Sequence, residues 1–254
     1  MSAPEPELTI VLPAFVAGLL VLATHVPLGQ QVLARGIVFI DLAIAQLAAL
    51  GVLLGHAFGM PAQGPAAQAA ALLAALAGAA LLACTEKRLG ARQEAFIGVL
   101  FVLAASVGVL LLAGNPHAGE HLRDVLVGQI LWVDAVSLAA LAAVAATVLV
   151  ALRMRFAAAF GGAGFYVLFA VAITASVQVV GVYLVFASLI VPALATVSLA
   201  GGARLIAGYA LGAAGYGLGL LASAMFDVPS GAAIVCALAA AASTFALLRR
   251  NVRG

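Results

Sequence analysis

Long uncharged apolar stretches, separated by short polar connections, make up almost the whole chain. Each is long enough to cross ~30 Å of hydrocarbon as a helix that rises about 1.5 Å per residue. The stretches are continuous and rich in Ala and Leu, whereas a membrane β-barrel would alternate apolar and polar positions. They predict membrane helices within residues 8–24, 37–55, 66–84, 95–113, 130–152, 156–203, 205–226 and 228–248.

The stretch 156–203 is too long for one crossing, since a crossing takes about 20 residues. It is either two passes joined by a tight turn, or one pass and a re-entrant helix. Pro192 lies within it and lacks an amide hydrogen, so we expect a kinked or broken helix there. The sequence therefore predicts one all-α transmembrane domain over residues 1–254, with eight or nine segments and a broken or re-entrant helix around Pro192.

Composition excludes the soluble classes. Of the 254 residues, 66% are hydrophobic and 8% are charged, against roughly 45–50% apolar and about 25% charged in a soluble domain. The net charge of +2 gives no basic face for nucleic acid. An integral membrane protein with lipid as its surroundings, and no nucleic-acid partner, is predicted.

Basic residues fix the orientation, because cytoplasmic loops collect Lys and Arg. Glu5 and Glu7 precede the first stretch, which favours an outer N-terminus. Ten of the eleven Lys and Arg residues then fall on the cytoplasmic side if 156–203 crosses an even number of times, and the C-terminus is cytoplasmic. These ten are Arg35, Lys87, Arg88, Arg92, Arg153, Arg155, Arg204, Arg249, Arg250 and Arg253.

Catalytic motifs are absent from the sequence. The single lysine, Lys87, is followed by Arg88, so there is no glycine-rich phosphate loop ending in GK[ST]. No HExxH motif or nucleophile elbow occurs either. A transport subunit rather than an enzyme is predicted, and any ATP used must be hydrolysed by another chain.

Asp41 lies inside the second stretch, where a carboxylate costs at least ~2.5 kcal/mol unless it faces a cavity or a partner. One interpretation is an interfacial residue that reaches the headgroup region or pairs with Arg35. The other is a residue that lines a path, where its oxygens suit Mn²⁺ or Fe²⁺ and tolerate Zn²⁺. Gln178, beside Thr174 and Ser176, either bonds neighbouring helices or lines the same path.

Histidines offer a second candidate site. His117, Glu120 and His121 share one face if helical, and could meet a metal together. The alternative is a solvated helix start. His25 and His56 are expected at span ends, as interfacial residues. Glycines at 208, 212, 215, 217 and 219 predict one closely packed helix face.

Three stretches carry a family resemblance. They are HVPLGQQVLARGIVFIDLAIAQLAALG at 25–51, VGVYLVFASLIVPALA at 180–195 and DVPSGAAIV at 227–235. In this order and spacing they resemble the permease subunit of the bacterial ABC importers for zinc, manganese and iron. The likeness runs over nearly the whole chain and implies location in the bacterial inner (plasma) membrane.

The resemblance implies partners and roles. It implies a homodimer around one translocation path, a separate cytosolic ATPase and an extracytoplasmic solute-binding protein. No cofactor is held permanently: the divalent metal is cargo, and ATP is used by the partner subunit. In this family the loop at 153–165 couples to the ATPase, which points here to Arg155, Phe156 and Phe160.

One position departs from the family pattern, which usually has a histidine four residues after the aspartate. Here that position is Ala45, and Gln46 follows. A π-bulge across 41–46 would bring Gln46 back toward Asp41 and make it a path residue.

The leading functional prediction is the permease of an ATP-driven divalent-metal importer, with Asp41, Gln46 and Gln178 on its path. The first alternative is an ABC permease for a non-metal or chelated cargo, which Gln46 suggests. A secondary carrier driven by an ion gradient is the second, although no convincing internal repeat is visible. A structural membrane scaffold is not favoured by the in-span Asp41.

Overall fold

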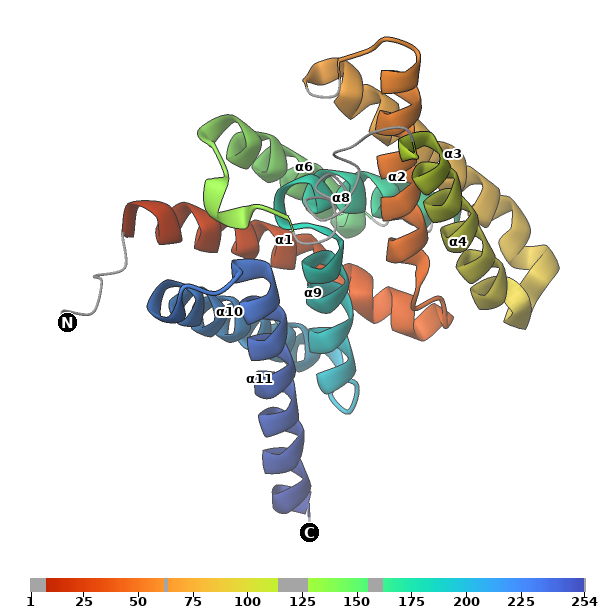
Figure 1. Cartoon of the computed structure of the whole chain (residues 1–254). Helices are drawn as coiled ribbons and strands as arrows, with labels where there is room; N and C mark the ends of the chain where they lie inside the picture. The colour runs from red at the N-terminus through yellow and green to blue at the C-terminus, as the bar shows by residue number, and fades with distance from the viewer. Residues whose placement is uncertain (1–7, 62–63, 114–127, 155–161, 254) are drawn as a thin grey trace.

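All regular elements in the described part of the chain are helices (Figure 1). The computed structural model describes residues 8–61, 64–113, 128–154 and 162–253. Two short 3₁₀ helices, η1 (Gly90–Arg92) and η2 (Ile130–Trp132), accompany the longer ones. The α-helices are α1 (Leu8–Arg35), α2 (Ile40–Ala57), α3 (Pro65–Leu89), α4 (Gln93–Leu112), α6 (Ala135–Arg153), α8 (Ala163–Val180), α9 (Val182–Ala195), α10 (Gly201–Phe226) and α11 (Ser230–Arg253).

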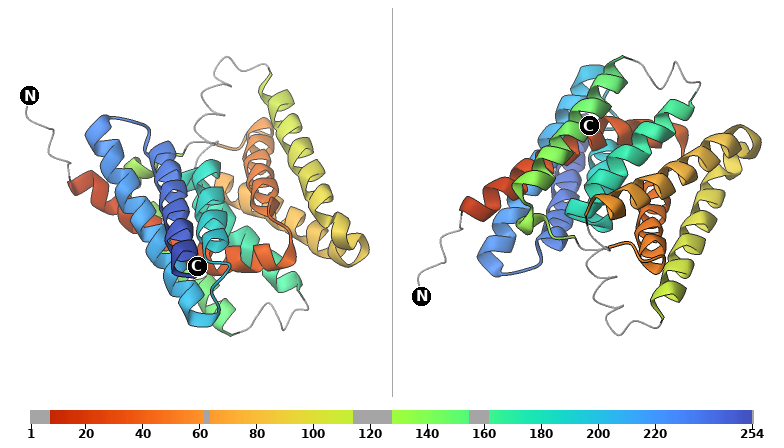
Figure 2. Two further views of the ribbon diagram at one scale, coloured as in Figure 1. Left: turned by 90° about the horizontal axis from the view of Figure 1, so that it is seen from below. Right: turned by 90° about the horizontal axis from the view of Figure 1, so that it is seen from above.

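Seven helical stretches of the described residues are long and apolar enough to cross a membrane. One of them, Pro65–Leu112, holds both α3 and α4, which are joined around η1 and diverge from there, with α2 packed against both (Figure 2). The remaining apolar helix, α9, has 14 residues. At about 1.5 Å per residue it falls short of ~30 Å of hydrocarbon. The predicted all-α membrane bundle is confirmed, and the chain is a multi-pass membrane protein.

The first helix is longer than its hydropathy predicts. The predicted span stops at residue 24, but α1 continues through Pro27 to Arg35 and has 28 residues. Proline is tolerated inside membrane helices because neighbouring groups satisfy the carbonyl it leaves free. His25 therefore lies within the helix and is fully buried, so its predicted place at a span end is wrong.

The helix break lies at Gly181 rather than at Pro192. Gly181 joins α8 to α9 with φ 79° and ψ 164°, a backbone conformation that essentially only glycine adopts. Helix α9 runs through Pro192 to Ala195, and the Thr196 amide still bonds to the Pro192 carbonyl at 3.2 Å. The predicted break around Pro192 is thus wrong in position, because one missing amide hydrogen interrupts the helix less than a positive φ does.

The glycines of α10 allow close approach on two sides. A Cβ at Gly208 or Gly212 would press on Val26 or Leu22 of α1. At Gly215 and Gly219 it would instead meet Leu238 and Ile234 of α11. The single packed face predicted for these glycines is wrong, because α10 lies between two helices and uses small residues against both.

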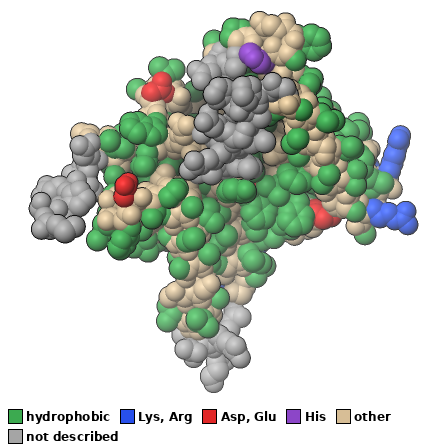
Figure 3. Space-filling model, in the orientation of Figure 1, with side chains coloured by type: hydrophobic (Ala, Val, Ile, Leu, Met, Phe, Trp, Pro, Cys, Tyr) green, Lys and Arg blue, Asp and Glu red, His purple; other side chains and the backbone are tan. Residues whose placement is uncertain are grey.

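Basic residues gather at connected helix ends. Arg35, at the end of α1, pairs with Glu86 near the end of α3 at 3.0 Å. Arg204 donates to the Ala193 carbonyl at 3.4 Å, and Arg249 donates to Ser198 at 3.2 Å. Figure 3 shows hydrophobic side chains over most of one face, with Lys and Arg side chains at one edge.

Candidate functional site

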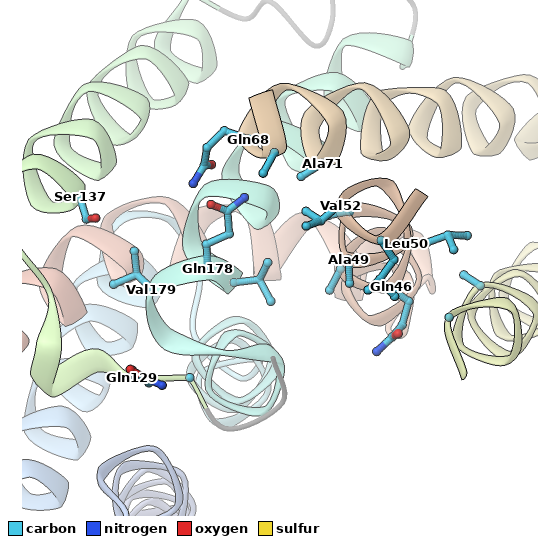
Figure 4. A pocket seen from close by; sticks show the side chains of 18 of the residues that line it. Gln46, Ala49, Leu50, Val52, Gln68, Ala71, Gln129, Ser137, Gln178 and Val179 are labelled. Atoms are coloured by element: carbon cyan, nitrogen blue, oxygen red, sulfur yellow. The ribbon is translucent and has the colours of Figure 1, made fainter. Parts of the chain in front are cut away.

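A cavity of about 480 Å³ lies among α2, α3, α4, α8 and the segment that leads into α6. Its walls are mostly Ala, Gly, Val and Leu, and none of its described lining residues is Asp, Glu, His, Lys or Arg. The polar side chains that line it are neutral (Figure 4): Gln46, Gln68, Gln129, Ser137 and Gln178.

Two of the three predicted path residues, Gln46 and Gln178, therefore line one cavity. They do not face each other: Gln46 points away from Gln178, whereas Gln178 extends toward Gln68 (Figure 4). Gln68, Gln129 and Ser137 were not predicted from the sequence. Polar residues are common near the ends of membrane helices, so these three do not stand out in the sequence. They come to line one cavity only because α3, α6 and α8 meet there.

The break between α8 and α9 forms part of this cavity region. Val177, Gln178 and Val179 line the cavity just before the break. Gly128, with φ 69°, lies directly against the backbone of Val180 and Gly181, where a Cβ would overlap. This backbone contact holds the loop before α6 against the end of α8.

Asp41 is the most unusual residue in the molecule. It lies in the first turn of α2 and is 1% exposed, and neither carboxylate oxygen has a hydrogen-bond partner among the described residues. Residues four apart share a helix face, so Asp41 lies one turn from Ala45, which lines the cavity. Asp41 itself is outside the cavity lining. The predicted pairing with Arg35 is not observed, since Arg35 bonds to Glu86.

Helix α2 is regular over residues 41–46, so the predicted π-bulge is wrong. Residues in an α-helix turn by about 100° each, which places Gln46 about 140° from Asp41 around the axis. The position that faces the cavity above Asp41 is therefore Ala45, and Gln46 is not a co-ligand of Asp41 in this conformation.

Glu94 is a second carboxylate beside Asp41. One of its oxygens accepts a hydrogen bond from the Phe39 amide at 3.1 Å, and the other is buried without a partner among the described residues. Phe39 is two residues before Asp41, so α4 holds the start of α2 in place. Glu94 was not predicted as a site residue because the predicted span begins at residue 95, whereas α4 begins at Gln93.

A contact cluster joins the ends of α1 and α3 to the start of α8. The Arg35 guanidinium lies 4.4 Å from the Phe165 ring centroid and bonds to Glu86. A Cβ at Gly162 would lie 3.6 Å from a Glu86 oxygen. The predicted coupling residues Arg155, Phe156 and Phe160 precede this cluster and lie outside the described residues.

The predicted metal triplet His117, Glu120 and His121 also lies outside the described residues. Within the described ranges, no group of three or more His, Cys, Asp or Glu side chains could hold a metal ion. His56 is exposed, and its Nδ1 lies 3.3 Å from the Met60 carbonyl oxygen.

Asp134 has a structural role, as the capping residue of α6. Its side chain caps α6 and accepts a hydrogen bond from the Ser137 amide at 2.8 Å. Hydrogen bonds from the side chain and the backbone of Ser137 lower the pKa of Asp134. Unlike Asp41, this exposed carboxylate is solvated and partnered.

Comparisons with known proteins agree with this architecture. The model of the family described as ABC 3 transport family matches residues 7–160 and 158–249. No curated protein matches the sequence. Among solved structures the chain is similar to PsaBC from Streptococcus pneumoniae in complex with Fab, with a TM-score of 0.74 and 22% identity over 94% of this chain and 91% of that chain. At this identity the likeness shows a shared helical fold.

Proposed function

Because the chain belongs to the ABC 3 transport family, we propose that it is the permease subunit of an ATP-driven importer whose cargo is a divalent metal ion. The whole chain, residues 1–254, acts as a single transmembrane permease domain. It supplies the path through the membrane and hydrolyses no ATP itself.

One observation supports the metal cargo: both carboxylate oxygens of Asp41 are buried and have no hydrogen-bond partner among the described residues. A buried carboxylate without a hydrogen-bond partner in the protein destabilises a membrane helix. Such residues typically mark the path of an ion or a substrate, which then supplies the missing partner. Carboxylate oxygens are hard ligands suited to Mn²⁺ and Fe²⁺, and they also bind Zn²⁺. Asp41 therefore binds the ion as it passes, with Glu94 beside it.

The cavity is the outer entrance to this site. Arg35 and Glu86 mark the cytoplasmic ends of α1 and α3, so α2 enters the membrane at Asp41 on the cytoplasmic side. Cavity residues Gln46 and Gln68 then lie further toward the outer face, with Gln178 at the end of α8. The C-terminus, which follows Arg249, is cytoplasmic.

Three kinds of partner complete the importer. A second copy of the chain forms the other half of the path, an ATPase subunit drives it, and an extracytoplasmic solute-binding protein delivers the ion. Arg155, Phe156 and Phe160 contact the ATPase. The cluster of Arg35, Glu86 and Phe165 supports this assignment, because it gives the end of that loop a firm attachment to three helices.

Reconstitution tests this function. The permease is placed in liposomes with its ATPase and binding protein, and uptake of Zn²⁺, Mn²⁺ and Fe²⁺ is measured together with ATP hydrolysis. We expect uptake of at least one ion, dependent on ATP, and stimulation of hydrolysis by that ion. Uptake that persists without the ATPase would contradict the proposal and favour a carrier driven by an ion gradient.

A second candidate is a permease for a chelated or non-metal cargo. The neutral lining of the cavity favours it, since amides such as Gln46 bind metal more weakly than imidazole. In the same reconstituted system, this candidate predicts ATP-driven uptake of a metal chelate but not of the free ion.

The triplet His117, Glu120 and His121 is proposed to bind metal at the outer face. Two imidazoles and one carboxylate are a usual ligand set for Zn²⁺. Alanine at both His117 and His121 is expected to raise the metal concentration for half-maximal uptake about tenfold while leaving the maximal rate unchanged, because ion capture would weaken by about 1.4 kcal/mol. Unchanged uptake at low metal would argue against this role.

A further inference from the structure

The lining of the cavity offers hydrogen-bond acceptors without charge. Amide groups of Gln68 and Gln178 and the hydroxyl of Ser137 carry acceptor oxygens. None of the described lining residues is a carboxylate, imidazole or thiolate, which are the side chains that displace water from a divalent ion. An ion in this cavity can therefore keep its bound water molecules, which donate hydrogen bonds to the lining oxygens, but it meets no side chain that would replace them.

The end of α8 adds a negative field. The last carbonyl groups of a helix lack amide partners within it, and the C-terminus carries about −0.5 of an elementary charge. Val177 and Val179 place this end of α8 at the cavity, and its last residue is Val180. The contact of Gly128 with Val180 and Gly181 fixes that end. Leu112, the last residue of α4, also lines the cavity, so two helix C-termini face it; the first turns of α3 and α6, with Gln68 and Ser137, bring the positive ends of two helices to the same cavity.

The cavity is also large enough for a hydrated ion. Six water molecules fill roughly 180 Å³, at about 30 Å³ each, and the cavity has about 480 Å³. Asp41, in contrast, is 1% exposed and lies one turn beyond Ala45 at the edge of the cavity. Space for a water shell exists in the cavity and not around Asp41.

We propose that the cavity binds the divalent ion as a hydrated cation, through hydrogen bonds from its water ligands to the oxygens of Gln68 and Gln178. The ion loses water only on reaching Asp41. This inference rests on the proposed metal transport and adds a separate binding step before it. The cavity selects ions by the charge and size of their hydrated form. Asp41 then selects among them by how well each ion binds a carboxylate ligand.

Hexaamminecobalt(III) tests the step, because it presents N–H donors on an inert shell and cannot lose them to Asp41. Uptake of radioactive Mn²⁺ is measured in the reconstituted importer against increasing hexaamminecobalt(III). We expect competitive inhibition of the unmodified protein. Gln68→Leu combined with Gln178→Leu should raise the inhibitory concentration about tenfold. Gln31→Leu, on α1 and outside the cavity lining, serves as the matched control and should behave as the unmodified protein.

A variant that is expected to strengthen inhibition separates the test from folding, because a misfolded protein would not bind the inhibitor more tightly. Gln68→Glu adds a charge to an exposed position, and it should lower the inhibitory concentration of hexaamminecobalt(III). Uptake that depends on Asp41 but is insensitive to hexaamminecobalt(III), or equally sensitive in all variants, would overturn the hydrated-ion step alone. No uptake of any free ion, with or without Asp41, would instead overturn the proposed function.

Discussion

Asparagine in place of Asp41 is expected to lower metal import about a hundredfold and, at the same time, to make the folded protein more stable. Interactions of a charged ligand are worth up to about 3 kcal/mol, which corresponds to about two factors of ten. The stability change has the opposite sign because Asp41 is buried with no hydrogen-bond partner in the part of the chain that the structure describes. Such a carboxylate costs at least ~2.5 kcal/mol in a membrane helix, and asparagine is neutral. Initial uptake rates and thermal unfolding in detergent measure the two effects.

Asp134→Asn is the matched control for this prediction. Asp134 is exposed and caps α6, and asparagine is an equally good capping residue. We therefore expect normal import and little change in unfolding temperature. A lower unfolding temperature in Asp41→Asn, with import retained, would mean that Asp41 stabilises the fold and does not bind the ion. Both variants keep the side-chain volume nearly constant, so packing does not confuse the comparison.

Valine in place of Gly29 is expected to prevent folding, and alanine there to destabilise the protein by about 3 kcal/mol. A Cβ at Gly29 would overlap the backbone carbonyl of Leu189, and it would lie 3.3 Å from the Ala193 Cβ. Backbone atoms cannot turn aside as a flexible side chain does, so α1 and α9 would have to separate. Overpacking in a close-packed interior costs about 1–3 kcal/mol, and more when neighbours cannot move.

Gly98→Ala is the control for the glycine prediction. Gly98 lies in α4, and a Cβ added there would have no atom of a neighbouring residue within 4 Å. Alanine is favoured over glycine inside a helix by about 1 kcal/mol, so this variant should unfold at a slightly higher temperature. The yield of folded protein and its unfolding temperature are measured for both sites. Equal tolerance at both sites would contradict the close α1–α9 contact.

Hydropathy predicted the membrane helices well because it depends on each residue's own transfer energy. Helix ends and breaks were harder to predict. The first predicted span ended before Pro27 and a break was expected at Pro192, yet α1 and α9 continue through these prolines. The break at Gly181 depends on a positive φ, and the sequence shows only a glycine that could have adopted it.

The candidate site was predicted in part. Asp41 and Gln178 were found because polar groups are rare within apolar stretches. A π-bulge was expected to bring Gln46 back toward Asp41, but α2 is regular there and keeps the two side chains about 140° apart around the axis. Glu94 could have been found as an acidic residue close to a predicted span end, although nothing in the sequence indicates that it reaches the Phe39 amide.

The amino-acid sequence alone determined that this protein is a membrane protein with many helices and that one helix carries a carboxylate. The reason is that the length of an apolar stretch and the position of its charges are properties of each segment by itself. Which side chains meet was decided only by tertiary packing. The cavity joins Gln68 to Gln178, residues far apart in the chain, and the burial of Asp41 depends on neighbours from other helices. Such juxtapositions follow from how close the glycine-bearing helices approach, and no local pattern encodes that distance.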